Sequence, residues 1–146
     1  MKTVMKGEGL CFEDVEVGSE VTPLLKGPIT RSQIVRYAGA SGDFNLIHID
    51  EEYAKNAGLG TVIAHGMLSM AFASQMMTDW LGINGDLKML KVRFTSMVRP
   101  GDTLTFKGKV VEKYKKRGKN YIVCEIWSEN QRGEKTLTGR AVATLP

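Results

Sequence analysis

The amino-acid sequence predicts an α+β fold in which an antiparallel sheet is wrapped around one long helix. Helical spacing and helix-capping signals dominate the chain up to Gly85. After Gly85, apolar and polar residues alternate with the period of two that is typical of half-buried strands. Between these two parts, residues 66–81 form a helix that is apolar almost all the way round. Such a helix must be enclosed by other elements rather than laid on a surface.

The first elements are expected ahead of this helix. Short apolar pieces and turn residues within residues 12–24 indicate an edge strand or an irregular arm. A helix should begin after Thr30, because Thr30 and Gln33 form a capping box in which each side chain bonds the backbone N–H of the other residue. Gly39 or Gly42 would end that helix.

A second, short helix should start at Asp50. The carboxylate of Asp50 can cap the helix, and the two glutamates that follow lie at the positive end of its dipole. The glycines within residues 58–60 would stop it. The enclosed helix then runs from Gly66 to Leu81, with Gly82 as its C-terminal cap.

About four long strands should follow as an antiparallel meander. Alternation or continuous apolar character marks residues 90–95, 103–107, 121–127 and 137–144, with turns at 99–102 and 117–120. A sheet of this size cannot close around the helix alone, and its edge strand would be exposed. We therefore expect a homodimer in which two copies pair edge to edge.

Length and composition are those of one globular domain over residues 1–146, with 42% hydrophobic and 25% charged residues. The net charge of +4 is mild, and much of it lies in Lys113–Lys119. This run is interpreted either as a solvated hairpin turn or as a patch that contacts phosphate. Nucleic-acid binding would need a broader basic face with exposed aromatic residues, so no nucleic-acid partner is expected.

Three features favour a cytoplasmic protein without a membrane partner. The first 18 residues contain no apolar signal core. The longest apolar stretch, Val62–Met77, is interrupted by polar residues and is interpreted as a buried helix rather than a membrane span. Cys11 and Cys124 have neither metal-binding nor redox spacing and are interpreted as free thiols.

The polar loop between the first two helices holds the candidate chemistry. Asp43 and His48 are five residues apart, and on a continuous helix they would diverge by about 140°. They converge only if the chain turns sharply between them, which Gly42 and Asn45 permit. A carboxylate and an imidazole around one water form a general acid/base pair. Taken alone, the spacing equally fits a turn aspartate and a structural histidine.

Residues 42–48, G-D-F-N-L-I-H, resemble the motif G-D-x-N-P-[LIV]-H of the MaoC-like, or (R)-specific enoyl-CoA hydratase, family. Residues 64–68 resemble the start of that family's central helix. Residues 92–94 resemble an early strand, and residues 98–104 the turn after it. The resemblance spans roughly residues 10–145 and implies a hot-dog fold with an overhanging short-helix segment that carries the active-site loop.

The resemblance implies a hydratase/dehydratase that interconverts trans-2-enoyl and (3R)-3-hydroxyacyl thioesters of CoA or acyl-carrier protein, with no cofactor. His48 would take the proton of the added water, and Asp43 would serve the α-carbon. Gly66, at a helix N-terminus, would donate its N–H to the thioester carbonyl. This hydrogen bond would lower the reaction barrier by about 3 kcal/mol. Asn45 would support the loop, or orient Asp43 through its amide.

Other residues near this motif carry expectations of their own. Ser41 is interpreted as a turn or supporting hydroxyl, and His65 as a packing or orienting residue rather than a second catalytic group. Leu46 replaces the proline of the family motif, which removes a stiff turn residue but no chemical group. A ferrous site from His48, Asp50 and His65 is the alternative for the same residues. Asp50 is better explained as a helix cap, so no metal is expected.

Two further functions fit the same resemblance. A hot-dog thioesterase would hydrolyse the acyl bond, and a non-catalytic acyl-binding subunit would pair with an active partner. The intact pair Asp43 and His48 argues against both. Acyl-chain length, carrier and reaction direction are left open by the sequence.

Overall fold

The computed structural model describes residues 9–146. Residues 1–8 belong to the predicted domain and to the stretch searched for a signal core, and they lie outside the described part. The elements in chain order are η1 (Phe12–Asp14), β1 (Glu20–Lys26), α1 (Arg31–Ser41), α2 (Leu46–Ile49), α3 (Glu51–Asn56), α4 (Gly66–Leu81), β2 (Asp86–Phe94), β3 (Leu104–Lys116), β4 (Lys119–Glu129) and β5 (Lys135–Leu145).

The five strands form one antiparallel sheet in the order β1-β3-β4-β5-β2. The expectation of a four-strand meander is therefore wrong in part. Strands β3, β4 and β5 do follow one another, but β2 pairs with β5 and the chain then crosses to the far side of the sheet before β3 begins. Alternation identifies a strand without naming its neighbour, so the sequence pattern did not contain this crossover.

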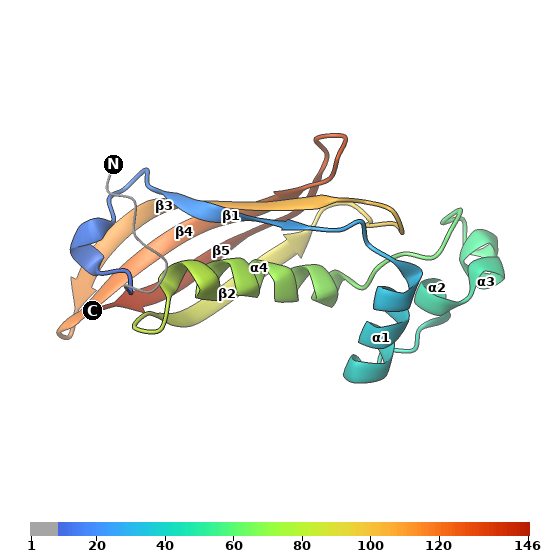
Figure 1. Ribbon diagram of the computed structural model, residues 1–146, viewed down its shortest axis with the longest axis horizontal. Coiled ribbons are helices and arrows are strands. Elements are labelled where there is room, and N and C mark those ends of the chain that lie inside the picture. The colour runs from blue at the N-terminus through green and yellow to red at the C-terminus, as the bar shows by residue number, and fades with distance from the viewer. Residues whose placement is uncertain (1–8) are drawn as a thin grey trace.

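Helix α4 lies along one face of the sheet (Figure 1) and contacts every strand of it. Its side chains Phe72, Met76 and Met77 are buried, and the Phe72 ring packs edge-on against Phe106 of β3 at 5.9 Å between centroids. Full burial of one such side chain stabilises the fold by about 1.5–3 kcal/mol. The α+β class is thus confirmed. The sheet covers only one side of α4, since Met67, Ala71 and Asp79 on that helix are exposed. Within residues 9–146, no helix has both the length and the apolar character required to cross a bilayer.

Helices α1, α2 and α3 form an overhang beyond the N-terminal end of α4 (Figure 1). The predicted caps are present: Thr30 Oγ1 accepts from the N–H of Gln33 at 3.1 Å, and Asp50 Oδ1 accepts from the N–H of Tyr53 at 2.8 Å. The N-cap of α1 is therefore only half of a capping box, since the hydrogen bonds of the described chain include none from the Thr30 N–H to the Gln33 side chain. Helix α2 was not predicted, because a single turn is too short to show a period.

The basic run Lys113–Lys119 is mostly strand rather than turn. Strand β3 continues to Lys116, and only Arg117 and Gly118, with φ values of 52° and 75°, form the two-residue hairpin loop. The ammonium group of Lys113 donates to the backbone carbonyls of Phe12 in η1 and of Val15, which directly follows η1. This hairpin and the overhang lie at opposite ends of the molecule (Figure 1), so the run does not border the predicted loop of the same chain.

Candidate active site

The turn between α1 and α2 brings the predicted pair together. Gly42 ends α1 in the left-handed region with a φ of 77°, and Asn45 caps α2 by accepting the N–H of Ile47 at 3.2 Å. The chain therefore turns within the four residues between the two helices. As a result, ligand atoms of Asp43 and His48 lie within 4.8 Å of one another and of His65, at the start of α4.

The hydrogen bonds of His48 identify its tautomer. Its side chain is buried, and Nδ1 lies 2.7 Å from the backbone oxygen of Ile63. A carbonyl oxygen only accepts, so Nδ1 carries the proton and donates it. Nε2 of the neutral ring is then unprotonated, and it lies 3.9 Å from Oδ2 of Asp43. The ring thus presents a free basic nitrogen to the carboxylate across a gap.

Asp43 is held at three points, although half of its side chain is exposed. Its N–H donates to Ser41 Oγ at 3.2 Å, and its Oδ1 accepts from the N–H of Asn45 at 3.2 Å. Its carbonyl oxygen accepts from Nε2 of His65 at 3.0 Å. Oδ2 is the carboxylate oxygen that faces His48. Asn45 therefore supports the loop through its backbone and through its cap of α2, and its side-chain amide does not orient Asp43.

His65 is buried directly behind this pair. Its ring is stacked on the His48 ring, with centroids 3.8 Å apart and planes inclined by 24°. The ring of Tyr37 also packs against the His65 ring, with centroids 4.8 Å apart and planes inclined by 59°. Among residues 9–146, nothing forms a hydrogen bond with Nδ1 of His65.

The geometry of this cluster does not suit a metal ion. Asp50, which the alternative ferrous site would need, does not lie with His48 and His65. Its carboxylate caps α3 instead. Imidazole donates to a metal through an in-plane lone pair. The stacked rings of His48 and His65 have nearly parallel planes, so their lone pairs do not converge on one point. Each ring also uses one nitrogen to donate to a carbonyl oxygen.

The N-terminus of α4 opens beside the pair. Gly66 is the first residue of the helix, and the side chain of the N-cap residue, His65, does not cap it. First-turn N–H groups have no partner within a helix and lie at its positive end. The ring of Phe94 lies against Gly66, such that a Cβ atom there would be 2.7 Å from Phe94 Cε2. A glycine is therefore needed for this close approach.

The carboxylate of Glu51 holds the segment before α4 in place. The sequence indicated only its favourable position at the helix dipole. Oε2 of Glu51 accepts from Arg31 at 2.7 Å, from Thr61 Oγ1 at 3.1 Å and from the N–H of Val62 at 3.3 Å. The hydrogen bond from Arg31 is the main reason that the pKa of Glu51 falls to about 2, with those from Val62 and Thr61 adding to it. The same segment carries the Ile63 carbonyl that orients His48. Arg31 and Glu51 are 20 residues apart, so no local pattern signals their contact.

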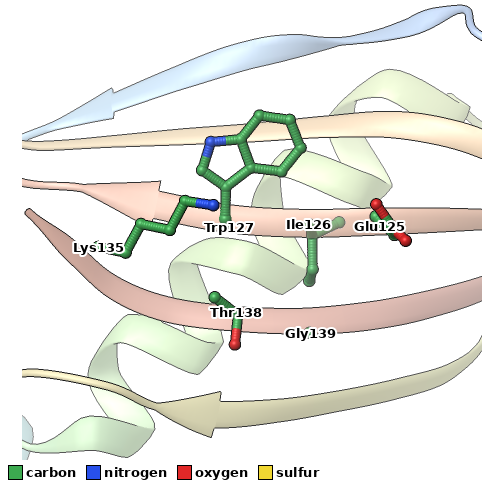
Figure 2. A pocket seen from close by; sticks show the side chains of 6 residues that line it. All are labelled: Glu125, Ile126, Trp127, Lys135, Thr138 and Gly139. Atoms are coloured by element: carbon green, nitrogen blue, oxygen red, sulfur yellow. The ribbon is translucent and has the colours of Figure 1, made fainter. Parts of the chain in front are cut away.

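A separate, shallow hollow lies on the outer face of β4 and β5 (Figure 2). Figure 2 shows α4 behind the strands, so this hollow opens away from the helix and from the overhang. The indole N–H of Trp127 donates to Glu129 at 3.1 Å, and the ammonium group of Lys135 lies 5.7 Å from the centre of the Trp127 ring. Trp127 and Lys135 are thus engaged by their neighbours, and the cluster around Asp43 and His48 is the stronger candidate.

Comparison with known proteins agrees with this fold. The family model described as MaoC like domain matches residues 14–131. A 3-hydroxybutyryl-CoA dehydratase of Methylorubrum extorquens is 33% identical over 138 residues, which cover 94% of this chain and 85% of that protein. An (R)-specific enoyl-CoA hydratase of Rhodospirillum rubrum is 38% identical over 95 residues, which cover 64% of this chain and 65% of the hydratase.

A solved structure gives the same result in three dimensions. R-hydratase PhaJ1 from Pseudomonas aeruginosa, in the unliganded form, superposes with a TM-score of 0.84 at 29% sequence identity. The superposition covers 94% of this chain and 86% of that one. The likeness confirms the hot-dog fold that the sequence motifs implied. The chain belongs to the family of proteins with a MaoC-like domain.

Proposed function

We propose that the protein is a hydratase/dehydratase that interconverts trans-2-enoyl and (3R)-3-hydroxyacyl thioesters carried by CoA or acyl-carrier protein. The observation that carries the proposal is the tautomer of His48. Because Nδ1 donates to Ile63, the unprotonated Nε2 faces Asp43 Oδ2 at 3.9 Å. The gap is longer than a direct hydrogen bond and leaves both groups free for a water molecule or a reacting carbon. The names of the two similar enzymes support the same reaction class.

In the hydration direction, Nε2 of His48 takes a proton from water while the water oxygen bonds to the β-carbon. Oδ2 of the Asp43 carboxylate then receives this proton from His48 across the gap and delivers it to the α-carbon. Both groups are thereby restored to their starting states. Dehydration follows the same path in reverse, with the roles of the two residues exchanged. The reaction uses side chains and water alone, so the proposal needs no metal and no cofactor.

Gly66 is proposed to bind the thioester carbonyl oxygen. Charge develops on this oxygen as the α-carbon becomes enolate-like, and an N–H at the open start of α4 is directed toward such a charge. One donor of this kind contributes about 3 kcal/mol to lowering the barrier. Ser41 and Asn45 contribute indirectly, since both hold the backbone or the carboxylate of Asp43.

A second copy of the chain is the proposed partner, paired along β2. Both edge strands contain one register shift, but the two edges differ in that β1 also contains Pro23, which disrupts strand pairing. β2 has no proline, and it leaves Met89 and Phe94 exposed by 40% and 47%. Edge-to-edge pairing would extend the sheet and cover these side chains.

The test follows loss of enoyl absorbance with crotonyl-CoA and longer 2-enoyl-CoAs. Asp43→Asn and His48→Ala should each lower kcat about 10²–10⁴-fold, because each removes one member of the acid/base pair. Asp79→Asn, an exposed carboxylate on α4, serves as the matched control and should retain the wild-type rate. A parallel thiol assay should detect no release of free CoA. Undiminished turnover by both dyad variants, or thiol release in place of hydration, would contradict the proposal.

A further inference from the structure

The burial of His65 lacks an explanation in packing alone. Its side chain is only 2% exposed, and no group among residues 9–146 hydrogen-bonds to its Nδ1. Nε2 donates to a carbonyl oxygen, so Nδ1 of the neutral ring is an unprotonated acceptor that is buried without a donor. A buried polar atom without a partner destabilises a fold. An apolar ring would fill the same space without burying an unpaired nitrogen. The presence of histidine therefore indicates that its other ring nitrogen, Nε2, is needed.

Nε2 of His65 is the atom that is used. It donates to the backbone carbonyl of Asp43 at 3.0 Å, across 22 positions of the sequence. This hydrogen bond ties the exposed α1–α2 turn to the buried start of α4. The other two anchors of Asp43 are local, since Ser41 at the end of α1 and Asn45 are each two residues away and would move with the overhang. His65 therefore supplies the contact that fixes Asp43 relative to the body of the protein.

The ring of His65 also restrains His48. The two imidazoles are stacked at 3.8 Å, and His48 is anchored at its far side by the Ile63 carbonyl at 2.7 Å. Rotation of the His48 ring would break both contacts. One side chain thus touches both halves of the proposed dyad, the main chain of Asp43 and the ring face of His48.

We infer that His65 is a positioning residue that sets the gap between Asp43 Oδ2 and His48 Nε2. This inference rests on the proposed function, since it concerns the dyad of that reaction. A gap shorter by about 1 Å would let the two groups hydrogen-bond directly, which would occupy the basic nitrogen. A wider gap would remove Asp43 from the substrate carbon. The tether through Nε2–H holds the distance at 3.9 Å, between these two limits.

Two variants separate the tether from the packing of the ring. His65→Phe keeps an aromatic ring against His48 but loses the donor to Asp43, and it should lower kcat about 10–100-fold with little change in KM. His65→Gln loses the ring, but its amide N–H reaches the position of Nε2 and should limit the loss to less than about fivefold. Wild-type kcat in His65→Phe, or equal losses in both variants, would overturn the inference.

A measurement on the wild-type protein tests the tether without any substitution. Nitrogen-15 NMR of the histidine rings should show His65 protonated at Nε2 and His48 protonated at Nδ1. Finding His65 protonated at Nδ1 instead would overturn the inference even if neither variant folds. Failure of the proposed function has a different signature, namely a wild-type protein that is inert toward 2-enoyl thioesters while both ring tautomers are as stated.

Discussion

The body of the protein and its overhang are stabilised by different forces. In the body, α4 and the five strands bury a continuous apolar core that includes Phe106, Met77 and Leu104. In α1, α2 and α3, by contrast, only Ile34, Ala38, His48 and Ala54 are buried. The overhang is instead held by directed hydrogen bonds, such as those that Glu51 accepts from Arg31, Thr61 and Val62.

This difference shows how the fold divides stability from geometry. Apolar burial is strong but non-directional, so it secures the α4–sheet body without fixing atoms at defined distances. Hydrogen bonds are weaker in net terms but fix both distance and angle. The proposed dyad is located where directed bonds predominate, and it is tied to the body through His65 and Ile63. Substitutions in the two regions should therefore separate stability from catalysis.

The largest effect on stability is expected in the body. Phe106 is fully buried against Phe72, so Phe106→Ala should lower the free energy of unfolding by about 3–5 kcal/mol. Urea titration measures the loss, and kcat of the molecules that stay folded should be unchanged. Leu25→Ala is the matched control, because Leu25 lies on the neighbouring strand but is 66% exposed, and its effect should stay within about 0.5 kcal/mol. Equal losses in both variants would contradict the apolar-core account.

An intermediate effect is expected where the two regions meet. Gly66→Ala places a Cβ 2.7 Å from the Phe94 ring and should destabilise the protein by about 1–3 kcal/mol. Adding Phe94→Leu should recover part of that loss, since the two positions are in contact. Gly39→Ala is the control, because nothing lies within 4 Å of its Cβ and the helix interior should gain about 0.5–1 kcal/mol. Thermal unfolding of the wild type, these three variants and Phe94→Leu alone tests this, and additive losses without recovery would exclude the contact as the cause.

A pH-dependent effect is expected in the overhang. The pKa of Glu51 is lowered from 4.5 to about 2 in the folded protein, so its stabilisation is complete above pH 4.5 and is lost as the pH falls toward 2. Glu51→Gln should remove that part of the acid dependence and speed amide exchange at residues 61–63. Glu52→Gln, the exposed neighbour, is the control. Melting curves from pH 2 to 6 provide the measurement, and an unchanged acid profile in Glu51→Gln would count against the network.

The smallest effect is expected at Leu46, where the family motif has proline. Asn45 has φ and ψ of −54° and 128°, which suit a residue before proline, and Leu46 is the first residue of α2. Leu46→Pro should therefore raise the free energy of unfolding by about 0.4–1 kcal/mol. Leu46→Ala removes the same side chain without the ring, so the comparison isolates the backbone effect. A proline variant less stable than the alanine variant would show that this turn differs from the motif's.

Local signals in the sequence predicted much of the fold. The caps at Thr30 and Asp50, the helix Gly66–Leu81 and the strands after Gly85 were all expected, because caps and periodicity act over a few neighbouring residues. The same holds for the convergence of Asp43 and His48, which depends on a turn of four residues between two helices. The pairing of β2 with β5 was not predicted, because strand order depends on where the chain crosses the sheet.

The sequence by itself thus determined the class of fold, the caps of the longer helices and the two residues of the proposed acid/base pair. Only the tertiary structure decided the tautomer of His48, the tether from His65 to Asp43 and the role of Glu51. These contacts join residues 11 to 22 positions apart, through backbone carbonyls and N–H groups that every sequence contains. A backbone group carries no residue-specific signal, so its partner is chosen by packing, after the chain has folded.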